Sequence, residues 1–262
     1  MHDVFYKQLV KLEKDIMYKF YEEKQIEFGL HDGAIYGLII EFRKKSMSAL
    51  YLLENNLTSG VGSLIRSLFE ITIYLEFIVK SDSVNRGTAF WLDYKLTQVK
   101  LFSLLKGNSK ESRETRAFLQ MDLDDFLRES ESYFPEESVD KWEKQYDKLL
   151  PRKDRRPRKW YDFDGRTKNF YDLCKSMNKI GEYNTIFRIF SQNTHSSDVS
   201  RNLNIGENYL EVESQVDNKE ALTKLVQSLT YSIINSAFKY YDLKGTERAV
   251  RSSLKLCFGN NK

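Results

Sequence analysis

Helix-breaking residues are scarce in this chain, and their scarcity is what most limits the folds open to it. The 262 residues include only 3 prolines and 12 glycines. Apolar residues recur at helical spacing over long segments, whereas a protein built from many strands needs more turn residues. Hydrophobic residues make up 41% of the chain, which excludes a disordered polypeptide. The sequence therefore predicts an all-α protein.

The apolar pattern divides the chain into a series of helices. We expect them at about 3–28, 33–55, 60–80, 84–106, 110–131, 136–149, 166–178, 181–196 and 217–243. Residues 197–215 instead place asparagines and a glycine between short apolar runs. This predicts a loop with at most one small β-hairpin near 199–213. Nothing demands a second domain, so we expect a single helical bundle over residues 1–262, with its core at about 31–243.

The segment 60–80 is apolar on nearly every side, which is typical of a helix at the centre of a bundle. It nevertheless contains Arg66 and Glu70, four residues apart. Buried charges are costly without partners, so we expect a polar network there. This network can be structural or part of a functional site, and the sequence leaves both open. The same charges make the segment a poor membrane span, and we expect a soluble cytoplasmic protein.

A second set of polar residues shares one face of the helix expected at 181–196. Arg188, Ser191 or Gln192, and His195 recur at spacings of three, four and seven residues. An arginine, a hydroxyl and an imidazole together can bind a phosphate and move a proton. We expect these three side chains to meet Arg66 and Glu70 in one pocket. There Glu70 would orient the imidazole, and Arg66 would bind an anion.

The loop expected at 150–162 is the clearest break in the chain, and it is strongly basic although the net charge is only +3. It contains two of the three prolines. A solvated surface loop and an electrostatic contact for nucleic acid would both have this composition, and the two interpretations stay open. The residues that would bind RNA are Arg152, Lys153, Arg155, Arg156, Arg158, Lys159 and Trp160, the last by stacking on a base.

Metal and cofactor sites have no recognisable signature in the sequence. Cys174 and Cys257 have neither metal-ligand spacing nor the pattern of a disulfide framework. No dinucleotide fingerprint, complete phosphate loop or kinase signature is visible. We therefore expect no metal and no cofactor.

Two segments resemble the signatures of an uncharacterised bacterial domain family. Residues 58–70 are similar to its arginine–glutamate helix, and residues 183–196 are similar to its second signature of an aromatic residue, an arginine, a serine and a histidine. More distantly, Arg188 and His195, with six residues between them, resemble the motif of the HEPN superfamily of helical toxins and antiviral effectors. HEPN nucleases usually have a polar residue directly after the arginine, where this chain has Ile189.

The HEPN resemblance implies a HEPN-like core, usually dimeric, that cleaves RNA without a metal ion. It implies that His195 manages the proton and that Arg188 stabilises the developing phosphate charge. We expect an endoribonuclease that acts as a toxin or an antiviral (abortive-infection) effector. Its partners would be RNA, a second copy of the chain, and an antitoxin or defence-system protein. The alternatives are a non-catalytic helical module that binds a nucleotide, nucleic acid or partner protein, and a small-molecule hydrolase or transferase.

Overall fold

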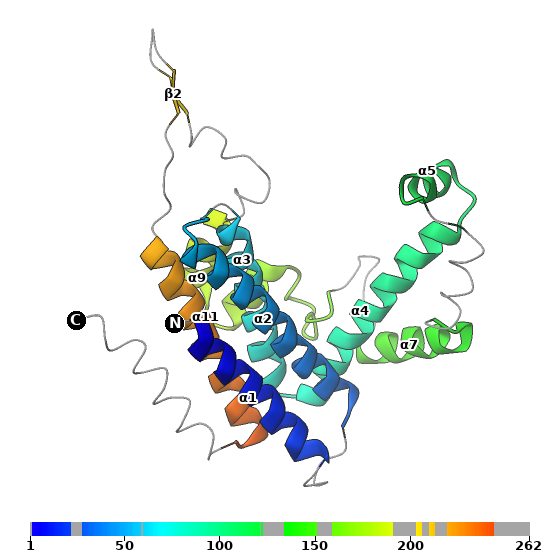
Figure 1. Cartoon of the computed structure of the whole chain (residues 1–262). Coiled ribbons are helices and arrows are strands. Elements are labelled where there is room, and N and C mark those ends of the chain that lie inside the picture. The colour runs from blue at the N-terminus through cyan, green and yellow to red at the C-terminus, as the bar shows by residue number, and fades with distance from the viewer. Residues whose placement is uncertain are drawn as a thin grey trace.

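The structure is a computed structural model, and it describes residues 2–21, 28–58, 60–120, 122, 134–150, 159–190, 203–205, 210–212 and 219–243. The helices are α1 (His2–Tyr21), α2 (Leu30–Glu54), α3 (Val61–Lys80), α4 (Ser83–Lys106), α5 (Lys110–Phe118), α7 (Glu136–Leu149), α8 (Phe170–Ser176), α9 (Ile180–Glu182), the π-helix η1 (Tyr183–Arg188) and α11 (Lys219–Tyr241). The strands β1 (Leu203–Ile205) and β2 (Leu210–Val212) pair antiparallel. The prediction of an all-α bundle with one small hairpin is confirmed (Figure 1).

Helix α3 lies at the centre of the bundle, as its apolar pattern predicts. It packs against both α2 and α11, and α1 packs on the outside of those two helices (Figure 1). Ile65, Leu68 and Phe69 of α3 are fully buried. Each buried side chain of this size stabilises the fold by about 1.5–3 kcal/mol. Within the described part of the chain, no helix is long and apolar enough to cross a membrane.

Polar contacts fix α11 in place within this apolar core. The Ser232 hydroxyl of α11 donates a hydrogen bond to a Glu76 carboxylate oxygen of α3. The Tyr241 hydroxyl donates to Asp32 of α2 at 3.1 Å, and Asp32 also accepts the backbone N–H of Gly29 at 3.0 Å. Because a buried carboxylate needs such bonds to offset its lost hydration, α11 is stable in only one register on α2 and α3.

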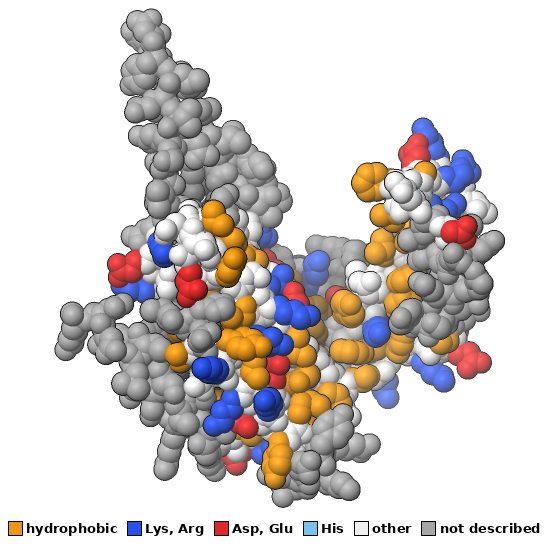
Figure 2. All heavy atoms as spheres, in the orientation of Figure 1, with side chains coloured by type: hydrophobic (Ala, Val, Ile, Leu, Met, Phe, Trp, Pro, Cys, Tyr) orange, Lys and Arg blue, Asp and Glu red, His pale blue; other side chains and the backbone are white. Residues whose placement is uncertain are grey.

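Helix α4 begins in the bundle and then leaves it. Its first half packs closely on α2: a Cβ on Gly87 would lie only 2.6 Å from the Cβ of His31. Its second half projects outward with α5 at its far end and α7 alongside, and these three parts are called the arm (Figure 1). Tyr146 of α7 donates to Asp93 of α4 at 2.9 Å, which holds α7 on the arm. Figure 2 shows apolar side chains on the arm surface, where Phe118 is 86% exposed.

Several of the expected helices differ from the prediction in their bounds; the helix expected at 166–178, for example, is the shorter α8. The helix expected at 110–131 ends at Phe118, because Gln120 adopts a left-handed conformation with φ of 51° that cannot continue a helix. The helix expected at 181–196 begins as a short α-helical turn and continues as η1, which is wound more loosely than an α-helix. Its end, from residue 191 onward, lies outside the described residues.

The prediction that Trp160 stacks on RNA is wrong, because its ring lies in the core. Trp160 is 5% exposed, and its ring centroid lies 4.9 Å from that of Phe90 and 5.3 Å from that of Tyr74. Both contacts are edge-to-face, an arrangement that aromatic rings favour. Tyr161 is buried beside it, and burial raises the pKa of its hydroxyl to about 12. The packing of Trp160 on α3 and α4 therefore anchors the end of the basic loop.

Substituting alanine for Trp160 should lower the free energy of unfolding by about 3–5 kcal/mol, because a large cavity would open between α3 and α4. Denaturant titration measures this difference. The control is Tyr94→Ala, which removes an aromatic ring that is 55% exposed on α4 and should change stability by less than about 0.5 kcal/mol. Equal losses for the two variants would contradict the structural role of Trp160.

Candidate functional site

Arg66 and Glu70 form an ion pair along α3. Arg66 Nε lies 3.3 Å from Glu70 Oε1, and the two side chains are 20% and 30% exposed. The pair spans one helical turn in the order that favours a helix less, with the arginine first. Since both groups are largely removed from water, each stabilises the charged form of the other.

The face of the Arg66 guanidinium is covered by an aromatic ring from another helix. Arg66 Cζ lies 4.1 Å from the centroid of Phe187, which belongs to η1. A cation over an aromatic face contributes about 0.5–2 kcal/mol, and more when both groups are shielded from water. This contact joins the charged pair of α3 to the segment that carries Arg188.

An aromatic cluster holds η1 against α3. The ring of Phe187 stacks on that of Tyr183 at 4.9 Å and also lies 4.9 Å from Phe170 of α8. Phe170 meets Phe69 of α3 edge-to-face at 5.9 Å. Tyr183 and Phe187 therefore hold η1 beside Arg66. Both belong to the signature in residues 183–196, but the sequence did not predict that Phe187 would cover Arg66.

Burial dominates the electrostatics at Glu70. It raises the pKa of the Glu70 carboxyl above its ordinary range, and the nearby charges of Arg66 and Lys45 only partly oppose this. Tyr74, one turn further along α3, also has a raised pKa because it is buried, with Glu70 as a second cause. Glu70 and Tyr74 thus lie in a poorly hydrated region, where each side chain holds its proton more tightly than it would in water.

The structure brings together only part of the predicted pocket. Arg66 and Glu70 lie beside η1, as expected, and Arg188 lies on η1 with its side chain exposed to solvent. Ser191 and His195 lie outside the described residues, so their approach to Glu70 stays a prediction.

Most of the predicted RNA-binding loop also lies outside the described residues. Lys159 is exposed at the end of this loop. The others are Arg152, Lys153, Arg155, Arg156 and Arg158, of which no position is described. Among the side chains that the structure does describe, no group of three or more histidines, cysteines or carboxylates is placed to hold a metal ion.

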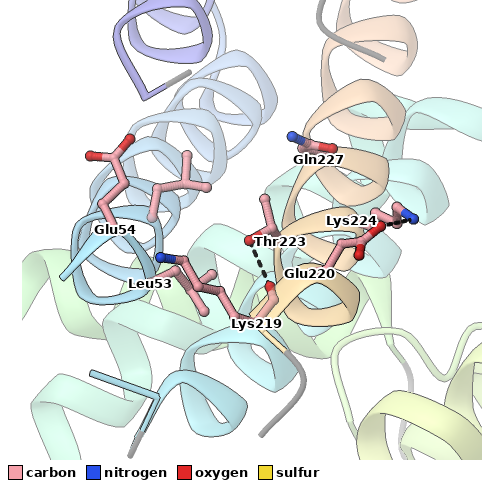
Figure 3. Close-up of a pocket in the computed structure, with 8 residues that line it drawn as sticks. Leu53, Glu54, Lys219, Glu220, Thr223, Lys224 and Gln227 are labelled. Carbon is pink, nitrogen blue, oxygen red and sulfur yellow. Dashed lines mark hydrogen bonds and ion pairs between the residues drawn. The ribbon is translucent and has the colours of Figure 1, made fainter. Parts of the chain in front are cut away.

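Two hollows in the described part of the molecule lie away from the charged pair on α3. A groove of about 410 Å³ runs between α2 and α11 (Figure 3). A smaller pocket of about 160 Å³ lies where the end of α3 meets the residues after the basic loop, and its wall includes Arg86, Tyr161 and Asp164. Neither hollow contains Arg66, Glu70 or Arg188 in its lining.

A family model matches residues 32–215, and its description is a family of unknown function, DUF5677. The chain belongs to this family. The match confirms the expected likeness to an uncharacterised domain family, whereas the likeness to HEPN proteins stays a prediction. Neither a curated protein nor a solved structure is significantly similar to the chain.

The DUF5677 match includes the helices that carry the site, from α2 to η1, but not α1 or α11. Both of these helices nevertheless pack on the matched region, and α11 covers α3 along much of its length. The buried faces of α2 and α3 would be open to water without them. The hydrophobic core of this protein therefore extends beyond the matched DUF5677 region.

Replacing Glu70 by glutamine should change how stability depends on pH. Burial raises the pKa of Glu70 in the folded state above 4.5, its ordinary value. In the pH window between that ordinary value and the raised pKa, the folded protein therefore binds a proton more tightly than the unfolded chain. The stability of the wild type should therefore fall, relative to Glu70→Gln, as pH rises through the window. Thermal unfolding between about pH 4 and about pH 7 measures this difference.

The control for this experiment is Glu114→Gln on α5. Glu114 is 67% exposed and pairs loosely with Lys110 at 3.7 Å, so its removal should shift the melting temperature little at any pH. A constant difference between wild type and Glu70→Gln across the window would show that Glu70 titrates as an ordinary exposed carboxyl.

Proposed function

We propose that the protein is a metal-independent, HEPN-like endoribonuclease that acts as a toxin or an antiviral effector. The observation that carries the proposal is the contact of Arg66 with Phe187. It places the charged pair of the central helix beside the segment that bears Arg188 and continues toward His195. The cluster thus combines positive charge with a carboxyl whose pKa is raised, and such groups often occur at catalytic sites.

In this mechanism the ribose 2′-hydroxyl attacks the adjacent phosphorus. His195 takes the proton of that hydroxyl as the bond from the 2′-oxygen to phosphorus forms. The bond from phosphorus to the 5′-oxygen breaks, and a water molecule protonates this oxygen and regains a proton from the imidazolium. The products are a 2′,3′-cyclic phosphate and a 5′-hydroxyl. Arg188, exposed on η1, stabilises the charge that develops on the phosphate oxygens, and Ser191 donates to one of them.

In this proposal Arg66 and Glu70 do not contact RNA but support the residues that do. Arg66 is packed under Phe187 and bonded to Glu70, so it suits a positioning role better than direct contact with RNA. Glu70 orients the imidazole of His195 in this proposal, as carboxylates commonly do for catalytic histidines.

RNA reaches this site along the basic loop. Its charged residues would contact phosphates without base specificity and make binding strongly dependent on salt. They are Arg152, Lys153, Arg155, Arg156, Arg158 and Lys159. We further propose that the protein works in the cytoplasm as a homodimer, and that an antitoxin or a defence-system partner restrains it.

A second candidate function is a non-catalytic module that binds a nucleotide, nucleic acid or partner protein. The pairing of Arg66 with Glu70 and its stacking on Phe187 favour this alternative, because a purely structural network satisfies its charges in the same way. The exposed Arg188 and the basic loop would then hold a ligand without cleaving it.

Incubation of the purified protein with total RNA in the presence of a chelator tests the ribonuclease. We expect cleavage that leaves 5′-hydroxyl ends, reduced at least about 100-fold by His195→Ala and by Arg188→Ala, because each removes a group that stabilises the transition state. His2→Ala and Arg166→Ala are matched controls, since Arg166 is also an exposed arginine, and they should cleave like wild type.

The same experiment separates the two candidates. If the wild type binds RNA in a salt-dependent way but does not cleave it, the ribonuclease proposal is wrong and the binding module is favoured. Cleavage by His195→Ala at the wild-type rate would remove the proposed catalytic role of the imidazole.

A further inference from the structure

The smaller pocket lies where the end of α3 meets the start of α4 and the residues on either side of α8. Its volume of about 160 Å³ has room for roughly five water molecules at about 30 Å³ each. Sites that enclose a whole drug-sized ligand measure about 300–1,000 Å³, so this pocket suits a single small group. Its lining includes two cations, Lys80 and Arg86, and one carboxylate, Asp164.

Arg86 is held at the pocket wall with much of its hydrogen-bonding capacity unused. Its Nη1 donates to the Phe77 carbonyl oxygen at 2.7 Å, and its Cζ lies 4.0 Å from the centroid of the Phe77 ring. A guanidinium has five N–H groups, and the described residues provide this one with no second acceptor. Burial lowers the pKa of Arg86, and the charge of Asp82 opposes this only in part. The charge of Arg86 is therefore fixed in position and only partly compensated.

Lys80 supplies the second cation. It is the last residue of α3, and its Nζ lies 3.9 Å from the sulfur of Met177, which also lines the pocket. A thioether is a weak and neutral acceptor, so it leaves the ammonium charge intact. Among the described side chains, no carboxylate oxygen lies within 4.0 Å of the charged nitrogens of Lys80 or Arg86.

A buried phenol is the third donor available to a ligand. Tyr161 is only 4% exposed, yet its hydroxyl makes no hydrogen bond within the described part of the molecule. The oxygen keeps some contact with solvent, and Tyr161 lines the pocket. Burial raises the pKa of this hydroxyl to about 12, so it keeps its proton at neutral pH. The other two hydroxyls of the lining already donate, that of Thr167 to Asp164 and that of Ser176 to a carbonyl oxygen of α8.

Asp164 is satisfied by its own turn and does not pair with the cations. Its Oδ1 accepts the backbone N–H groups of Arg166 and Thr167 at 2.8 and 2.9 Å, and also the Thr167 hydroxyl. Although burial acts to raise the pKa of Asp164, these hydrogen bonds lower it below its ordinary value. With two cations and one carboxylate, the lining keeps a net charge of +1.

We infer that this pocket binds a terminal phosphate group, either of a phosphomonoester or of inorganic phosphate. Such a group has three strong acceptor oxygens and a charge of about −1.5 to −2 at neutral pH. The Arg86 and Lys80 side chains bind its charged oxygens, and the Tyr161 hydroxyl donates to a third. A carboxylate has fewer oxygens and a single charge, so it would leave one donor unused.

The inference is independent of the proposed ribonuclease. It concerns residues that lie at the far end of α3 from Arg66, and its probes contain no phosphodiester bond between two nucleotides. Loss of the ribonuclease proposal would leave it unchanged, and its own failure would leave the ribonuclease proposal unchanged.

Isothermal titration calorimetry of the full chain with methyl phosphate, at constant ionic strength, tests the inference. We expect saturable binding with one ligand per chain. Dimethyl phosphate lacks one terminal oxygen and one charge, and acetate lacks the phosphorus and one oxygen, so each should bind at least about tenfold more weakly. Absence of saturable binding by methyl phosphate, or dimethyl phosphate binding as tightly, would overturn the inference.

Inorganic phosphate and uridine 5′-monophosphate distinguish the two sources of the group. Tighter binding of the nucleotide supports a phosphorylated ligand whose remainder contacts the rim of the pocket. Tighter binding of inorganic phosphate supports the free ion. If neither of them binds, the pocket does not recognise a terminal phosphate and the inference is wrong.

Substitutions locate the binding in the pocket. Lys80→Gln, Arg86→Gln and Tyr161→Phe should each weaken methyl phosphate binding at least about tenfold, because each removes a donor to a charged oxygen. Lys106→Gln and Tyr94→Phe are matched controls and should bind like wild type: Lys106 is likewise the exposed last residue of a helix, and Tyr94 is an exposed tyrosine of α4. Wild-type affinity in both Lys80→Gln and Tyr161→Phe would place the ligand elsewhere and refute the site.

Discussion

The architecture depends on covering α3 on every side while giving its charged residues partners. Packing against α2 and α11 buries most of the apolar surface of this helix. Its carboxylates then need partners in a region with little water, and each finds one: Glu70 pairs with Arg66, and Glu76 accepts the Ser232 hydroxyl. An uncompensated charge at either place would cost several kcal/mol. The Ser232 bond also joins α11 to α3, and the contact of Arg66 with Phe187 joins η1 to α3.

This requirement also determines which residues remain available for chemistry. The Arg66 guanidinium is held by a carboxylate on one side and the Phe187 ring on another, which favours a role in positioning. Arg188 on the neighbouring segment is exposed, and in the proposed function it is the group that contacts the phosphate. Under that proposal the half-buried pair would support an exposed group, and rigid support limits the conformations of groups that meet substrate.

Membership of DUF5677 covers residues 32–215, but the physical unit of this protein is larger. Helix α11 lies outside that range, yet it covers α3 and forms one wall of the groove that holds Lys219 and Thr223. The groove therefore exists only where a matched helix, α2, meets an unmatched one.

The sequence by itself determined the helical class, the central place of α3 and the small hairpin, because apolar periodicity and the scarcity of breakers are local properties. It also indicated that Arg66 and Glu70 need partners. Only the tertiary structure decided that Phe187 covers Arg66 and that Trp160 enters the core instead of facing RNA. A tryptophan beside a basic loop has the same sequence signature in either environment. Which one it occupies depends on whether distant helices, here α3 and α4, leave a space that its ring fills.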